Sequence, residues 1–64
     1  MKRTALEKQL RKRAEAMGLE MVFVREGGAH TIWRIGSYQF SIPRHKDINE
    51  ITARAILDGA KEAK

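Results

Sequence analysis

The chain has 64 residues, with thirteen Lys and Arg against eight Asp and Glu, a net charge of +5 and no cysteine. This length predicts one domain, residues 1–64, without a deep pocket for a small metabolite, and the lack of cysteine excludes disulfides and cysteine-based zinc sites. The positive charge favours a polyanionic partner such as nucleic acid, and the alternative is a basic surface that serves only solubility.

No apolar run approaches the roughly 20 residues that a membrane span requires. The first residues, Met1-Lys2-Arg3-Thr4, lead into an amphipathic segment rather than an apolar one. We therefore expect a cytoplasmic protein that contacts no membrane.

The first predicted element is a helix over about residues 4–17. Thr4 and Glu7 have the spacing of a capping box, in which each side chain satisfies a free backbone amide. Gly18 predicts the C-terminal end of this helix. Apolar residues recur at helical spacing and form one stripe: Leu6, Leu10, Ala14 and Met17.

Three short strands are predicted next. The apolar run over residues 21–24 is followed by a Gly27-Gly28 turn, and residues 29–35 form the second strand. A tight turn at Gly36-Ser37 precedes a third strand with alternating Tyr38, Phe40 and Ile42. Pro43 ends the sheet, because proline cannot donate to a strand ladder.

The last predicted element is a helix that begins at a second capping box, Asp47 to Glu50. Its apolar residues Ile48, Ile51, Ala55 and Ile56 share one side of a helical wheel. Leu57 points away from this stripe, so we expect it to be exposed and available to a partner-binding patch.

The order helix, three-stranded antiparallel sheet, helix predicts an α+β fold in which two amphipathic helices cover one face of the sheet. This is the topology of double-stranded-RNA-binding domains, a likeness that does not establish RNA binding. So small a chain needs most of its large apolar groups inside, so we expect Trp33, Phe23 and Phe40 in the core.

His30 is the first candidate for chemistry, because histidine exchanges protons near neutral pH. Strand alternation places it on the face opposite Trp33, so it faces solvent if Trp33 is buried. There it could deprotonate a ribose 2′-hydroxyl while Arg25 and Arg34 hold the phosphate. The alternative is an ordinary polar surface residue.

His45 lies in a basic connector, Pro43-Arg44-His45-Lys46, just before a predicted helix N-terminus that attracts phosphate. It could contact RNA or act as a second proton carrier, and the alternative is a solvated basic loop. Neither histidine has the spacing of a metal ligand, so we expect no metal and no cofactor.

Two segments, residues 25–33 and 42–48, resemble the HicA family of toxins, and the likeness covers nearly the whole chain. The matching motifs, in order, are Gly28-Ala29-His30, Pro43-Arg44-His45, Arg54 and Ile56-Leu57. The resemblance implies a double-stranded-RNA-binding-like fold, ribosome-independent mRNA cleavage with His30 as the active residue, and neutralisation by a HicB-type antitoxin. One departure is Ala29, where many members carry serine or asparagine.

The residues and the resemblance together predict an endoribonuclease toxin of a type II toxin–antitoxin system, an mRNA interferase with His30 as its catalytic residue. The predicted RNA contacts are Arg25, Gly28, Arg34, Arg44, His45 and Lys46. Two other classes remain open: a non-catalytic nucleic-acid-binding module that uses the basic face for affinity alone, and a protein-interaction domain.

Overall fold

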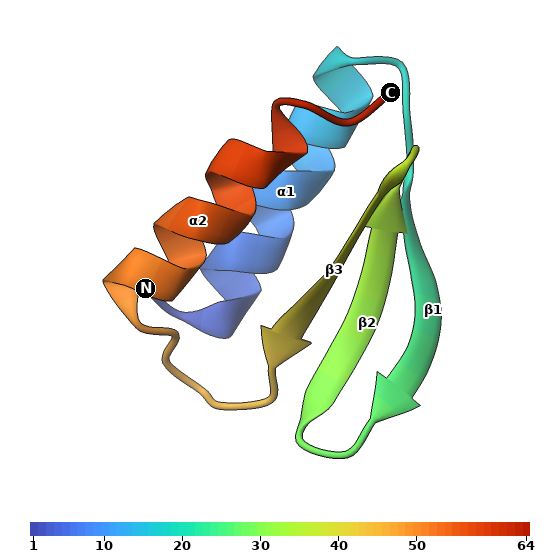
Figure 1. The fold of residues 1–64 in the computed structure, drawn as a ribbon. Helices are drawn as coiled ribbons and strands as arrows, with labels where there is room; N and C mark the ends of the chain where they lie inside the picture. The colour runs from blue at the N-terminus through green and yellow to red at the C-terminus, as the bar shows by residue number, and fades with distance from the viewer.

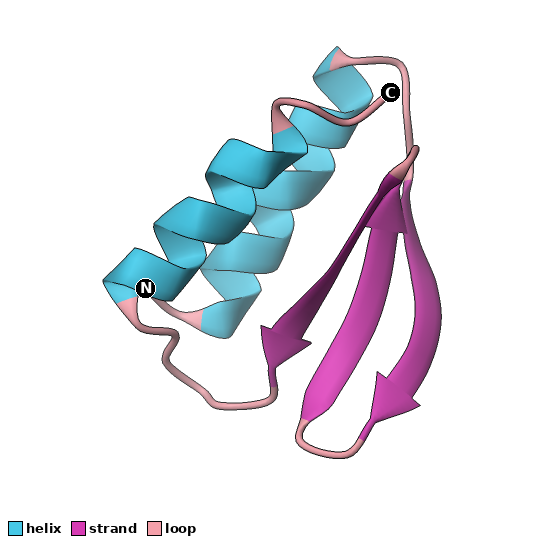
Figure 2. Ribbon diagram, in the orientation of Figure 1, coloured by secondary structure: helices cyan, strands magenta, loops and turns pink.

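A computed structural model describes residues 1–64 and confirms the predicted α+β order. The elements are α1 (Arg3–Ala16), β1 (Met21–Gly27), β2 (His30–Ile35), β3 (Tyr38–Pro43) and α2 (Glu50–Ala60). The two helices form one layer and the antiparallel sheet, in the order β1-β2-β3, forms the other (Figures 1 and 2). Neither helix is long and apolar enough to cross a membrane.

Two tight turns connect the strands, the second at Gly36-Ser37 as predicted and the first one residue later than the predicted Gly27-Gly28. The β1–β2 turn consists of Gly28 and Ala29, between the paired residues Gly27 and His30. Gly28 has a φ of 60° and Ala29 has no positive φ, the pattern of a type II′ turn, whose first central position favours glycine. One feature was not predicted: the register shifts between Phe23 and Arg25, which makes Val24 a bulge in β1.

The core lies between the two layers. Its most deeply buried large side chains come from α1 and from the inner face of the sheet: Leu6, Leu10, Ile35 and Ile42. Phe40 is buried as predicted, and Trp33 is half-buried against this cluster. The prediction for Phe23 is wrong, because its side chain is 51% exposed. β1 is an edge strand, so the Phe23 ring has a strand neighbour on one side only, where it meets Trp33 edge-to-face at 5.9 Å.

α1 begins without the predicted capping box. Its N-cap residue is Lys2, which makes no side-chain cap, while Thr4 lies inside the helix. The Arg3 amide instead donates to the Lys46 carbonyl at 2.9 Å, so the connector before α2 supplies the acceptor that a capping side chain would provide. The C-terminal prediction is confirmed: Gly18 has a φ of 73° and the Leu19 amide donates to the Ala14 carbonyl at 2.8 Å.

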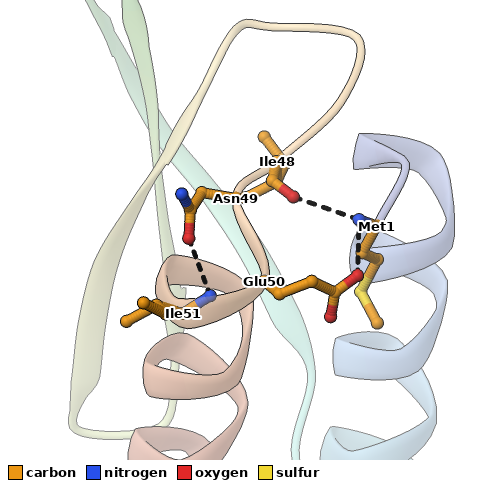
Figure 3. A network of polar contacts seen from close by, with 5 residues as sticks. All are labelled: Met1, Ile48, Asn49, Glu50 and Ile51. Carbon is orange, nitrogen blue, oxygen red and sulfur yellow. Dashed lines mark hydrogen bonds and ion pairs between the residues drawn. The ribbon is translucent and has the colours of Figure 1, made fainter.

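α2 is capped by Asn49 and not by Asp47 as predicted. The Asn49 Oδ1 accepts from the Ile51 amide at 2.8 Å (Figure 3). Glu50 does not complete a capping box either, because its carboxylate accepts from the Met1 ammonium at 2.9 Å. The same ammonium donates to the Ile48 carbonyl at 3.1 Å. This hydrogen bond and the positive charge of the ammonium lower the pKa of Glu50.

The buried face of α2 also differs from the prediction. Its buried residues are Ala53, Ile56, Leu57 and Ala60. Ile51 is 81% exposed, whereas Leu57 is only 8% exposed and cannot serve as an exposed patch. The predicted stripe took its phase from Ile48, which is buried but precedes the helix, so it does not share the helical period.

Candidate functional site

The candidate site lies at one end of the molecule, the lower end in Figure 1. The β1–β2 turn, the end of β3, the connector to α2 and the beginnings of both helices all lie at this end (Figure 1). Both histidines of the chain belong to these segments. The fold therefore gathers five segments of the chain around its two histidines.

His30 is the first residue of β2 and is exposed, as the alternation predicted. It pairs with Gly27 on β1 and with Pro43 on β3. Neither neighbour carries a long side chain. Neither paired residue therefore covers the imidazole, and the His30 side chain is exposed.

Arg25 and Arg34, predicted as a pair of phosphate ligands, lie at different distances from His30. The Arg25 Nη1 atom lies 3.5 Å from where a Cβ on Gly27 would be, and Gly27 is directly opposite His30. The guanidinium thus reaches the neighbourhood of His30. Arg34 shares the same face but is four residues further along β2, about 13 Å away at 3.3 Å per residue. Of the two arginines, Arg25 is the one that lies near His30.

Gly28, which the sequence analysis predicts as an RNA contact, is exposed and lies in the β1–β2 turn. A Cβ on Gly28 would meet no atom within 4 Å, so the space above it is open, but its positive φ disfavours other residues. Its role in the site is to shape the turn that presents His30.

A shallow hollow of about 250 Å³ brings His30 and His45 together although they are fifteen positions apart in the sequence. Asp47 is the only carboxylate in its lining. The hollow is bounded by the end of β3 and by the beginning of α2, and its lining consists of His30, Pro43, His45, Asp47, Ile48, Asn49 and Thr52. Two imidazoles on one hollow can accept and donate protons within a single bound group.

Arg44 and Lys46 lie outside this hollow, although they flank His45 in the sequence. The Arg44 guanidinium lies 3.4 Å from the Glu26 carboxylate. Both cations border a second hollow of about 350 Å³, which we call the basic hollow. Its lining consists of Lys2, Arg3, Thr4, Arg44 and Lys46. The structure thus places Arg44 and Lys46 in a hollow separate from the one that the histidines line, together with Lys2 and Arg3, which the sequence analysis did not predict as site residues.

Lys2 and Arg3 were missed because nothing local marks them as part of a site. Lys2 forms an isolated antiparallel bridge with Asp47, and this contact joins the start of the chain to the connector. The only signal in the sequence was the positive charge of the first residues. No group of three or more His, Asp and Glu side chains in the chain could hold a metal ion.

Comparisons of the chain with protein-family models, with curated proteins and with solved structures gave no significant match. The function proposed below therefore rests on the residues and their geometry, together with the motifs that resemble HicA toxins.

Proposed function

We propose that the protein is an endoribonuclease in which His30 accepts the proton of a ribose 2′-hydroxyl. The observation that carries the proposal is the hollow at the end of the sheet, where an exposed His30 lies with a second histidine and the Arg25 guanidinium approaches the strand pair that holds His30. The 2′-oxygen attacks the adjacent phosphorus, so the nucleophile comes from the RNA itself.

Phosphate binding is shared between two places in this proposal. Arg25 stabilises the charge that develops on the reacting phosphate. Lys2, Arg3 and Lys46 of the basic hollow hold the RNA backbone away from the reacting group. The net charge of +5 supports a polyanionic substrate of this kind.

His30→Ala tests the central role of His30. Its side chain is exposed, so we expect a stability change within about 0.5 kcal/mol. Loss of the general base should slow single-turnover RNA cleavage by about 10²- to 10⁴-fold. Gln39→Ala is the matched control, because Gln39 is exposed on the same sheet face opposite Arg34. Cleavage by His30→Ala at the wild-type rate, with the fold intact, would refute the proposal.

On the resemblance to HicA toxins, we further propose that mRNA is the substrate and that a HicB-type antitoxin neutralises the protein. The simplest inhibition of an open site is to cover it, so the antitoxin should place carboxylates against the basic residues near His30. Diethyl pyrocarbonate modification of His30, measured by mass spectrometry, should be suppressed in the complex. Unchanged modification would contradict inhibition by covering.

A non-catalytic nucleic-acid-binding module is the second candidate function. It is favoured by the basic hollow, whose four cations can hold phosphates without any histidine. In that case purified wild-type protein binds a labelled transcript in a salt-dependent gel shift and leaves it intact.

A further inference from the structure

We propose that His45 is the general acid of the cleavage reaction and donates the proton that the departing 5′-oxygen requires. This inference rests on the proposed ribonuclease function and assigns a second catalytic residue to the same site. Its basis is the hollow that His30 and His45 line together.

The two histidines approach this hollow from different elements. His30 lies on β2, within the sheet, and His45 lies on the connector between β3 and α2. In transfer of a phosphoryl group, the attacking and leaving oxygens lie roughly in line on opposite sides of phosphorus. A proton acceptor and a proton donor must therefore approach the phosphate from different directions, and two histidines that line one hollow from different elements can do so.

The beginning of α2 favours one position for the leaving oxygen. Asn49 and Thr52 line the hollow, and a helix N-terminus carries a partial positive charge that stabilises nearby negative charge. The Ile51 amide donates to the Asn49 side chain, whereas the amides of Glu50 and Thr52 donate to no protein group. The negative charge that develops on the 5′-oxygen is favoured here, beside the connector that carries His45.

The proposed step is balanced in atoms and electrons. His30 takes the proton of the 2′-hydroxyl while the bond between O2′ and phosphorus forms. The bond between phosphorus and O5′ breaks, its electron pair stays on O5′, and His45 in its imidazolium form gives that oxygen a proton. The products are a 2′,3′-cyclic phosphate and a 5′-hydroxyl. Both histidines are exposed, so each returns to its starting protonation state by exchange with water.

The experiment compares two leaving groups. A cleavage position is first mapped on a transcript with wild-type protein. Two DNA oligonucleotides with one ribonucleotide at that position are then made, one with an ordinary phosphodiester and one with sulfur in place of the bridging 5′-oxygen. A thiolate leaves without protonation because thiols are far more acidic than alcohols, so the sulfur substrate does not need a general acid.

We expect His45→Ala to cleave the ordinary substrate at least about 10²-fold more slowly than wild type and the sulfur substrate at nearly the wild-type rate. His30→Ala should be slow on both substrates, since both need the 2′-oxygen deprotonated. His45→Gln, which keeps a polar side chain but carries no exchangeable imidazole proton, should behave like His45→Ala and serves in its place if that variant does not fold.

Three results would overturn the assignment. Equal slowing of both substrates in His45→Ala would make His45 a phosphate contact, and unchanged cleavage of the ordinary substrate would leave it without a role. Rescue of His30→Ala by sulfur would reverse the two roles. If wild-type protein cleaves no transcript at all, the ribonuclease proposal itself fails, and this outcome is separate from the other three.

Discussion

Tyr38 occupies the space that a side chain at position 59 would need. Its hydroxyl donates to the Ile56 carbonyl of α2 at 3.1 Å, and its ring stacks on Phe40 with centroids 4.9 Å apart. Burial raises the pKa of Tyr38, so the hydroxyl remains a donor at neutral pH. A Cβ on Gly59 would lie 2.6 Å from the Tyr38 Cζ atom and closer still to the hydroxyl oxygen. Glycine is therefore required here by a close approach between β3 and α2.

Gly59→Ala should consequently destabilise the protein, although alanine is the better helix former. The gain in helix propensity is about 1 kcal/mol, and overpacking a well-filled site costs about 1–3 kcal/mol. The displaced hydroxyl also loses its bond to Ile56, worth about 0.5–1.5 kcal/mol. Urea unfolding should show a net loss.

The double variant Tyr38→Ala, Gly59→Ala is the control for this contact. Without the ring there is no clash, so Gly59→Ala should be neutral or stabilising in the Tyr38→Ala background. Equal effects of Gly59→Ala in both backgrounds would show that the ring is not the cause.

Residue exposure could be predicted from the sequence where a strand lies between two others. The exposure of His30 followed from simple alternation along β2, the central strand. Phe23 could not be placed in the same way. Phe23 pairs with Trp33 and therefore shares the inner face of the sheet. It lies on an edge strand, however, and its burial depends on whether a helix distant in sequence covers that edge.

At the scale of elements, the strands and turns were predictable because their signals are local. Period-two alternation and the glycine turns predicted the second and third strands to within one residue of their observed bounds, whereas β1 continues beyond the predicted run of residues 21–24 to Gly27. The first residues of the two helices could not be predicted, because groups distant in sequence bind the residues that would form the caps. The Arg3 amide donates to the Lys46 carbonyl, and the Met1 ammonium donates to the Glu50 carboxylate. Neither predicted capping box forms.

Asn49→Ala tests the observed start of α2 against the predicted one. Removing the Oδ1 acceptor leaves the Ile51 amide without its cap, and such losses cost about 0.5–2 kcal/mol. Asp47→Ala is the matched comparison, since the Asp47 carboxylate accepts no hydrogen bond from a backbone amide of this helix. Thermal unfolding should give a clearly lower Tm for Asn49→Ala. A larger decrease in Tm for Asp47→Ala than for Asn49→Ala would support the predicted capping box instead.

At the scale of the whole molecule, the candidate site consists of segments that are separate in the sequence and meet only in the fold. The sequence predicted His30 together with Arg25, and His45 as a separate candidate, and the fold brings His30 and His45 onto one hollow. It also brings Lys2 and Arg3 beside Arg44 and Lys46 through the bridge between Lys2 and Asp47. Contacts between residues more than forty positions apart leave no local pattern in the sequence, so the basic hollow could not be predicted from it.

The basic hollow makes a quantitative prediction for RNA binding. Each cation that neutralises a phosphate releases counterions, so the plot of log Kobs against log salt concentration has a slope of about −0.7 per contact for single-stranded RNA. Lys2→Ala and Lys46→Ala should each make this slope shallower by roughly 0.7. Binding is measured by fluorescence anisotropy in the His30→Ala background, so that the RNA stays intact.

Lys61→Ala is the control, because Lys61 lies just after α2, at the end opposite the site, and pairs with Asp58 at 3.7 Å. It removes the same charge as Lys46→Ala, so a difference between the two variants reports position and not net charge. We expect the slope of Lys61→Ala to equal that of the His30→Ala parent. If Lys61→Ala lowers the slope as much as Lys46→Ala does, RNA binds the basic protein diffusely and the basic hollow is not its path.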